Sequence, residues 1–268
     1  MTLGGDGPIL ASAREFMHTW CPPIIAFGLG TLGYMCSFSY ETYKKTLESI
    51  LLAESYKEKP PSERPGVQFR SRLKLSIVNG NPRKQIITHS VEGDQMLVER
   101  DVFRLHALNE IVVDRGPSQS LSSILLFIDD IYLTEVSGDG LIFSTPTGSS
   151  AYNLSAGGPL VHNDVPCIMM TPICPHSLSF RPLTLPSSAT VKLAVPENAR
   201  SSAWIGIDGD YRFELMRGEM LEIEMSLSSV PFVFFEDTNL MDVWTKRLVH
   251  LLNWNKRPSQ KSLKKHKI

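Results

Sequence analysis

A glycine-rich turn near the start of the chain carries one acidic side chain. Residues 4–7 read Gly-Gly-Asp-Gly, and a helical pattern follows over residues 9–16. Glycines such as Gly5 and Gly7 let a backbone approach phosphate closely, and a helix N-terminus attracts it. Asp6 would repel phosphate, so it suits proton abstraction from an attacking hydroxyl or the holding of Mg²⁺. An ordinary turn is the alternative interpretation.

A polar pair, Asn109 and Glu110, interrupts a segment that otherwise has the pattern of a strand. Such a pair is either an exposed edge of the strand or a hydrogen-bonding group aimed at a ligand. An amide beside a carboxylate would suit ribose hydroxyls and an adenine edge. The pair alone leaves both interpretations open.

A dense hydroxyl-rich stretch over residues 137–158 joins a predicted strand to a short predicted helix that ends at two glycines. Several OH and N–H donors would be presented together there, which favours a phosphate or ribose site. Turn chemistry of serine and threonine is the alternative.

His176 lies in a proline-rich turn, where it is either a base or a turn residue satisfied by the backbone. We assign it a supporting role. The four cysteines have neither zinc-ligand nor redox-pair spacing, which indicates buried thiols in a reducing compartment. No side-chain cluster predicts a metal site, so Mg²⁺ would arrive with a nucleotide, near Asp6.

The elements that must position these residues fall into two classes. Residues 1–66 alternate glycine turns, an apolar run and a helix capped by Ser39, which is typical of an α/β domain. Residues 67–232 carry period-two strands, beginning with apolar Val67, Phe69 and Leu73, and an Asp208-Gly209 hairpin turn. This pattern predicts an all-β domain of sandwich type. Residues 233–254 predict a helix that packs back on the first domain, and 255–268 a disordered basic tail.

Composition sets further bounds. The 268 residues suffice for one large or two modest domains of roughly 100–200 residues. A hydrophobic fraction of 42% argues against disorder of the whole chain, and a net charge of -1 predicts no nucleic-acid or membrane partner. The longest apolar stretch, residues 24–38, is interrupted by glycines and too short for a membrane span. No secretory pattern precedes it, so we expect a cytoplasmic protein, with mitochondrial or nuclear location as alternatives.

Taken in order, these segments resemble the NAD kinases, in particular the fungal and animal branch. The resemblance is carried by TPTGSSAYNLSAGGPLVH from residue 145, TPICPHSLSFRPL from 171, LNEIVVDRGPS from 108 and LLNWNKR from 251. It implies transfer of the γ-phosphoryl group of ATP to the 2′-hydroxyl of the adenosine ribose of NAD⁺, with a divalent cation. It also implies an incomplete Rossmann-like domain, a β-sandwich NAD-binding domain and a homo-oligomer.

The resemblance assigns roles to individual residues. Asp6 would be the proton acceptor, with Gly5 and Gly7 beside it at the phosphates. The implied dinucleotide site comprises Asn109, Glu110, Asp139, Ser150, Ala151, Tyr152, Asn153, Ser155 and Asp210, supported by Thr145, Thr147, His176 and Asp208.

Two departures from the family pattern motivate a second hypothesis. Pro8 replaces the usual threonine and offers phosphate neither N–H nor hydroxyl. Only residues 1–3 precede the glycine loop, where relatives have a strand and a helix, so we expect a truncated domain with a weakened ATP site. The alternatives to a working NAD kinase are therefore a non-catalytic NAD-binding paralogue and, because it shares the glycine loop, a lipid kinase.

Overall fold

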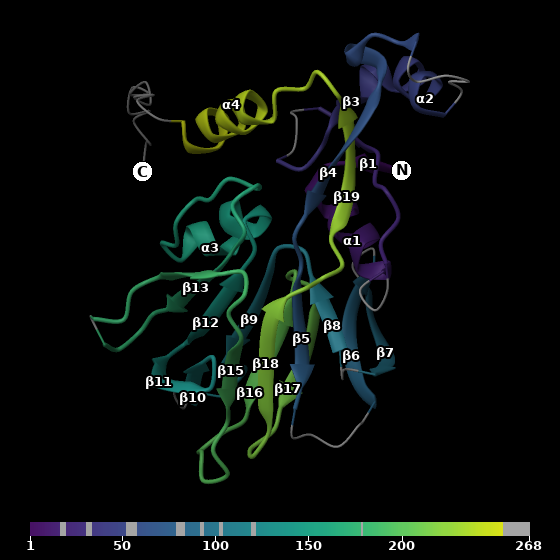
Figure 1. The fold of residues 1–268 in the computed structure, drawn as a ribbon. Helices are drawn as coiled ribbons and strands as arrows, with labels where there is room; N and C mark the ends of the chain where they lie inside the picture. The colour runs from purple at the N-terminus through teal and green to yellow at the C-terminus, as the bar shows by residue number, and fades with distance from the viewer. Residues whose placement is uncertain are drawn as a thin grey trace, which may run out of the picture.

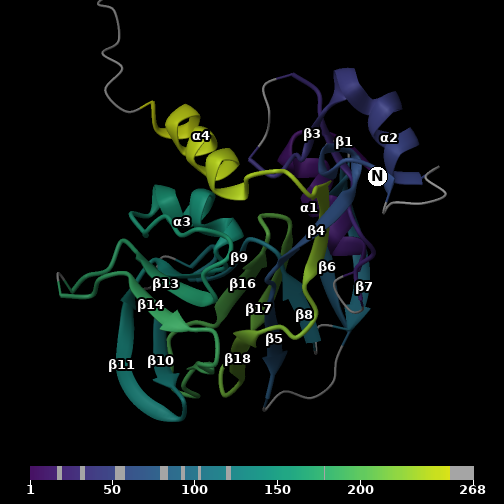
Figure 2. The same ribbon diagram turned by 45° about the horizontal axis from the view of Figure 1, so that its top comes forward.

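The computed structural model of the chain describes residues 1–16, 20–30, 34–51, 58–78, 84–91, 94–101, 104–118, 122–177 and 179–253. Figures 1 and 2 show a β-rich body beneath a smaller α/β part, with the last helix crossing above. The predicted tail, residues 255–268, lies outside the described residues. Within the described part of the chain, no helix is long and apolar enough to span a bilayer.

The α/β part is a three-stranded parallel sheet in the order β1-β2-β3. Its strands are β1 (Thr2–Gly4), β2 (Ala26–Gly28) and β3 (Phe38–Ser39). Helix α1 (Asp6–Glu15) leaves β1 directly, and the 3₁₀ turn η1 (Tyr40–Thr42) leads from β3 into α2 (Tyr43–Leu51). Ser39 accepts a hydrogen bond from the N–H of Glu41, which confirms the predicted cap.

The β-rich part is a sandwich, as predicted. Its six-stranded sheet has the order β11-β10-β15-β18-β5-β8, and its eight-stranded sheet β14-β13-β12-β9-β16-β17-β6-β7. Inward side chains of both sheets, such as Leu75 and Val113, form one buried core.

The strands have the following bounds. The six-stranded sheet contains β5 (Leu73–Ile77), β8 (Arg104–Ala107), β10 (Ser122–Ile128), β11 (Ile131–Gly138), β15 (Val191–Ala194) and β18 (Met220–Met225). The eight-stranded sheet contains β6 (Lys84–Val91), β7 (Asp94–Asp101), β9 (Glu110–Asp114), β12 (Gly140–Ser144), β13 (Cys167–Ile173), β14 (Leu183–Pro186), β16 (Ala203–Ile207) and β17 (Tyr211–Leu215).

A two-stranded ribbon joins the two parts. Strand β4 (Pro65–Arg70), preceded by the 3₁₀ turn η3 (Pro61–Glu63), pairs antiparallel with β19 (Val230–Phe235). The predicted boundaries at 66/67 and 232/233 therefore fall within two strands that pair with each other. The division into two domains remains our proposal, with this ribbon as the connection between them.

The side chains of β4 face the opposite way from the prediction. Val67 and Phe69 are 49% and 66% exposed, whereas Gln68 and Arg70 are buried. In β5 the apolar Leu73, with Leu75 and Ile77, is buried as expected. The alternation reverses because β4 lies outside the sandwich and, among the described strands, pairs with β19 alone. Its polar face is thus turned inward.

Helix α4 (Leu240–Leu252) follows the ribbon and begins at Asn239, whose side chain accepts the N–H of Asp242. Its Leu240 packs against the apolar cluster of the α/β part, as predicted for a returning helix. Its Trp244 ring also meets the ring of His162 edge-on, 5.1 Å between centroids. The helix therefore contacts both parts of the molecule, which Figure 1 shows as its position above α3 (Tyr152–Ser155).

Candidate active site

Asp6 is held at the first turn of α1 by the segment that precedes β3. Its Oδ1 accepts the N–H of Met35 at 2.8 Å, and its Oδ2 accepts the N–H of Tyr34 at 3.0 Å. A carboxylate has further lone-pair sites, so both oxygens keep acceptor capacity. A Cβ added at Gly5 or Gly7 would meet no heavy atom within 4 Å, which leaves the loop accessible to a ligand.

Pro8 stands inside the first turn of α1. The first N–H groups of a helix have no intrahelical partner, so proline costs no helical hydrogen bond there. The glycine loop is therefore still followed directly by helix α1, although Pro8 has no backbone N–H.

Asp208 organises the Asn109-Glu110 pair. Its carboxylate accepts the N–H groups of Leu108, Asn109 and Glu110 at 2.9, 2.7 and 3.1 Å. Its own N–H donates to the carbonyl of Glu110 at 3.0 Å. Asp208 and Gly209 have φ values of 48° and 73°, the positive pair that a tight hairpin between β16 and β17 requires. The predicted hairpin is confirmed, and its aspartate fixes the polar pair on β9.

Asn109 and Glu110 are both buried, at 7% and 6% exposure. Asn109 Oδ1 and Glu110 Oε2 have no hydrogen-bond partner among the described residues. Burial raises the pKa of Glu110 to about 8, and the charge of Asp208 is the second cause of this rise. The N–H of Tyr152 donates to Glu110 and opposes the rise. Burial also raises the pKa of Asp208 despite its three N–H donors. Two polar acceptors are thus held rigidly and left unsatisfied, which is typical of a ligand position.

The hydroxyl-rich segment packs directly behind this pair. Thr145 Oγ1 donates to the Leu108 carbonyl at 2.6 Å and accepts the N–H of Gly148 at 3.1 Å. A Cβ at Gly148 would lie 2.2 Å from the Asn109 carbonyl oxygen, so only glycine permits this approach. The 3₁₀ turn η4 (Thr147–Ser150) and α3 follow. Thr145 therefore holds the backbone beside the pair, and its supporting role in ligand binding stays a prediction.

An ion pair between Arg14 and Asp210 connects α1 to the hairpin that carries Asp208. Both side chains are largely buried, at 9% and 13% exposure. The guanidinium also lies 5.4 Å from the ring centroid of Tyr211. The helix of Asp6 and the sheet of Asn109 are thereby fixed relative to each other.

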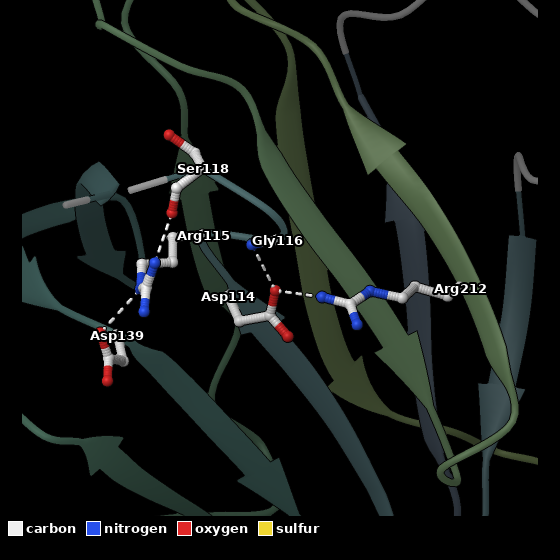
Figure 3. A network of polar contacts seen from close by, with 6 residues as sticks. All are labelled: Asp114, Arg115, Gly116, Ser118, Asp139 and Arg212. Atoms are coloured by element: carbon white, nitrogen blue, oxygen red, sulfur yellow. Dashed lines mark hydrogen bonds and ion pairs between the residues drawn. The ribbon is translucent and has the colours of Figure 1, made fainter. Parts of the chain in front are cut away.

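A second polar network lies at the end of β9 (Figure 3). Arg115 Nε donates to Asp139 Oδ1 at 2.8 Å, and Arg212 Nη2 donates to Asp114 Oδ1 at 2.6 Å. With Gly116, these residues line a cavity of about 210 Å³ together with Tyr152 and Ile173. Tyr152 connects this cavity to Glu110, to which it donates its N–H.

Comparison with known proteins decides the family. Residues 1–55 match the model of the ATP-NAD kinase N-terminal domain, and residues 108–235 match that of the ATP-NAD kinase C-terminal domain. NAD kinase 2, chloroplastic, of Arabidopsis thaliana is 41% identical over 97% of this chain and 24% of its own length. The NAD(+) kinase of Saccharomyces cerevisiae is 38% identical over 98% of this chain and 46% of its own length.

The chain belongs to the NAD kinase family.

Solved structures agree with this NAD kinase family membership. Yeast NADH kinase complexed with NADH is 33% identical with a TM-score of 0.74, covering 97% of this chain and 67% of the other. An NAD kinase from Archaeoglobus fulgidus in complex with ATP is 23% identical, with a TM-score of 0.64 over 94% of this chain and 81% of the other, and shares the fold. The chain spans less than half of the length of each of the two curated relatives above.

In this NAD kinase family member, the predicted residues of the hydroxyl-rich segment have different surroundings. Tyr152 and Ser155 are exposed, and Ser150 and Ala151 are half-buried. Asn153 is fully buried, donating to the carbonyls of Ser149 and Pro159 and accepting the hydroxyl of Thr171 at 2.7 Å. Its side chain is engaged within the fold and positions the segment.

The two remaining predicted supporting residues are Thr147 and His176. Thr147 contacts Asn163 at 3.5 Å. His176 is exposed, donates its N–H to the Ser137 carbonyl and lines a separate cavity of about 510 Å³ with Arg181. The His176 backbone thus makes a turn contact, and the supporting role of its side chain stays a prediction.

The sequence patterns missed four residues that surround Asp6 or its helix: Arg14, Tyr34, Arg70 and Arg247. Arg70 and Arg247 both interact electrostatically with Asp6. The sequence of β4 does contain a signal for Arg70, because polar and apolar residues alternate there. That alternation alone does not tell which face of the strand is buried.

Proposed function

We propose that this chain catalyses transfer of the γ-phosphoryl group of ATP to the 2′-hydroxyl of the adenosine ribose of NAD⁺, giving NADP⁺. The observation that carries the proposal is the buried pair of unsatisfied acceptors on Asn109 and Glu110, organised by Asp208 in a chain of this family. Ribose hydroxyls are donors that would satisfy both acceptors.

Asp6 is proposed as the proton acceptor. The ribose hydroxyl is a poor nucleophile, and a positioned carboxylate that takes its proton contributes about 10²–10⁴ in rate. The N–H groups of Tyr34 and Met35 hold the Asp6 carboxylate in one orientation. Phosphoryl transfer otherwise requires mainly positioning and charge neutralisation, and the fold offers no Ser-His-Asp set among its described contacts.

A divalent cation is proposed to accompany the ATP. The described residues contain no cluster of His, Cys, Asp or Glu able to hold a metal ion by itself. Mg²⁺ commonly takes phosphate oxygens, waters and only one or two carboxylates, and Asp6 fits that limited share. When bound, the cation would neutralise phosphate charge.

The remaining dinucleotide contacts are proposed from the sequence. Asp139 and Tyr152 line the cavity at the Figure 3 network, and Ser150, Ala151 and Ser155 lie close to Tyr152 in the sequence. Asp210 is placed beside Arg14, and Asn153 positions the segment from within. A homo-oligomer and a cytoplasmic location also remain predictions.

A coupled assay tests the proposal. Purified chain, NAD⁺, ATP and Mg²⁺ are combined with an NADP⁺-specific dehydrogenase and its substrate, so that absorbance reports NADP⁺. Turnover proportional to chain concentration supports the kinase. NAD⁺ binding by calorimetry without any turnover would instead support the non-catalytic paralogue that Pro8 suggests. The family membership sets the lipid-kinase hypothesis aside.

A further inference from the structure

Arg70 is a buried cation whose donors are largely unused. It ends β4, is 1% exposed, and its Nε and Nη1 have no hydrogen-bond partner among the described residues. Its guanidinium lies 4.6 Å from the ring centroid of Phe232 on the paired strand β19. A cation–π contact holds the plane of the guanidinium but leaves its N–H groups free for another acceptor.

Arg247 of α4 lies near enough to Arg70 to interact with it electrostatically. Its Nη2 donates to the Cys36 carbonyl, and its guanidinium lies 6.0 Å from the Tyr34 ring centroid. Its Nε is buried without a partner among the described residues. The two arginines therefore come from the connecting ribbon and the last helix, and both face the segment that holds Asp6.

The electrostatics show that this pair is not compensated. Burial, and next the charge of Arg247, lower the pKa of Arg70 to about 10, with Tyr34, Asp6 and Asp164 opposing. Burial likewise lowers the pKa of Arg247, opposed chiefly by Asp6. Arg70 is buried and Arg247 is half-buried, and two neighbouring cations with so little solvent are costly unless an anion joins them.

The nearby carboxylates accept hydrogen bonds from other groups. Both oxygens of Asp6 accept backbone N–H groups, and Asp164 accepts the Gln68 amide at 3.0 Å while its side chain is 59% exposed. No ion pair joins Arg70 or Arg247 to a carboxylate within the described ranges. The unsatisfied N–H groups of Arg70 and Arg247 could therefore bind an acceptor on a ligand.

The chemistry of that acceptor follows from the donors. A guanidinium fork matches phosphate oxygens bidentately, and two forks from different directions match adjacent phosphates of one chain. The open space at Gly5 and Gly7 gives such a chain access beside Asp6. We propose that Arg70 and Arg247 form a clamp for the phosphate chain of the nucleoside triphosphate donor.

The assignment of the clamp to the ATP donor rests on the proposed function. In that function the unsatisfied atoms of Asn109 and Glu110 suit ribose hydroxyls, and the arginines suit the phosphate anions. The dinucleotide also carries a pyrophosphate, so the test must separate the two sources. Inorganic tripolyphosphate isolates the phosphate chain from both nucleosides.

Isothermal titration of the full chain with tripolyphosphate, with a non-hydrolysable ATP analogue and with NAD⁺ tests the clamp. The variants are Arg70→Met and Arg247→Met, and the control is Lys246→Met, which removes an exposed cation from the same helix. We expect each arginine variant to weaken tripolyphosphate and ATP-analogue binding about tenfold or more, with NAD⁺ affinity changed less than about threefold. Lys246→Met should leave all three affinities unchanged.

Arg70→Lys is a second variant for the case in which Arg70→Met misfolds, because lysine keeps the buried charge but lacks the bidentate guanidinium. It should weaken tripolyphosphate binding less than Arg70→Met does. If Arg70→Met does not fold, the tripolyphosphate affinity of Arg247→Met tests the clamp. Equal tripolyphosphate affinity in wild type and variants would overturn the clamp. Loss of NAD⁺ affinity alone would overturn its assignment to the donor. Arginine-dependent tripolyphosphate binding in a chain without NADP⁺ formation would refute the kinase and keep the clamp.

Discussion

The molecule brings together two pairs of ionisable groups, two carboxyl groups and two guanidinium groups, and the fold supports them differently. The acidic pair, Glu110 and Asp208, is tied into the sheet by backbone N–H groups that hold Asp208 on both oxygens. Among the described contacts of the basic pair, Arg70 and Arg247, the backbone acceptor is the Cys36 carbonyl, which Arg247 contacts. The first site is built into one domain, whereas the second is assembled from the ribbon and the last helix.

This difference indicates what each region receives. A buried acceptor without a partner, such as Glu110 Oε2, suits a neutral hydroxyl donor. Buried guanidinium donors without a partner suit an anion. Asp6 interacts electrostatically with both arginines, and its helix is joined to the acidic site through Arg14 and Asp210. The two regions are therefore the proposed acceptor and donor halves of one site.

The largest effect is expected where the two halves meet. Asp6→Asn keeps the shape of the side chain but removes its basicity, so NADP⁺ formation should fall by about 10²–10⁴. NAD⁺ affinity, measured by calorimetry, should stay within about threefold because Asn109 and Glu110 are unchanged. Asp242→Asn, an exposed aspartate at the start of α4, is the control and should keep full activity. An Asp6→Asn chain with more than about a tenth of wild-type turnover would remove Asp6 from the mechanism.

Asp208→Asn should destabilise the acidic half by about 2–4 kcal/mol, because it breaks charge-assisted hydrogen bonds with buried N–H donors. The measurement is urea denaturation. Asp129→Asn is a matched control, since Asp129 also has positive φ in a hairpin turn but its contact, to the N–H of Thr190, is exposed. That control should cost less than about 1 kcal/mol. Equal losses in both variants would show that Asp208 has no special positioning role.

Glu110→Gln should change the pH dependence of stability. Because the pKa of Glu110 in the folded chain is about 8, above its ordinary value of 4.5, its protonation favours the folded state. This stabilisation is complete below about pH 4.5 and is lost as the pH rises towards about 8, by up to about 1.4 kcal/mol per pH unit.

Denaturation of wild type and Glu110→Gln should be compared between about pH 5 and about pH 8. The wild-type free energy of unfolding should fall relative to that of the variant as the pH rises. Asp208 titrates in both chains, so the difference isolates Glu110. Parallel curves would contradict the buried, unpaired environment assigned to it.

The smallest effect is expected in the Figure 3 network. Asp139 is 41% exposed in its pair with Arg115, so Asp139→Asn should cost less than about 1 kcal/mol of stability. If Asp139 contacts the dinucleotide, the KM for NAD⁺ should still rise about threefold to tenfold with KM for ATP unchanged. Steady-state kinetics with each substrate varied separates these effects. An unchanged KM for NAD⁺ would limit Asp139 to holding Arg115.

Much of the acidic half could be predicted from the sequence. Asp208-Gly209 is a turn signal with a direct backbone cause, and Asn109-Glu110 stands out because polar residues interrupt a strand. What the sequence could not show is that the Asp208 side chain reaches back across the sheet to the N–H groups of that pair. That contact spans about 100 residues of chain, as the separation of 98 between Glu110 and Asp208 shows.

The basic half could not be predicted in the same way. In β4 the period-two pattern is real, but the assumption that its apolar face is buried is wrong there, because the strand pairs with β19 outside the sandwich core. Arg70 therefore looked like a solvent-facing residue. Arg247 lies in a helix whose apolar stripe gave no sign that a neighbouring arginine turns towards Cys36. The basic half forms because strand β4 and helix α4, which are far apart in the sequence, bring Arg70 and Arg247 together, and no local sequence pattern shows this.

Transfer of label from [γ-³²P]ATP tests the central claim most directly. The purified chain is incubated with Mg²⁺ and either NAD⁺ or its analogue that lacks the adenosine 2′-hydroxyl, and the products are separated by chromatography. We predict labelled NADP⁺ from NAD⁺ and no labelled dinucleotide from the analogue, although the analogue binds. Binding of NAD⁺ and ATP without transfer, or label on the 2′-deoxy analogue, would contradict the joining of donor and acceptor halves at Asp6.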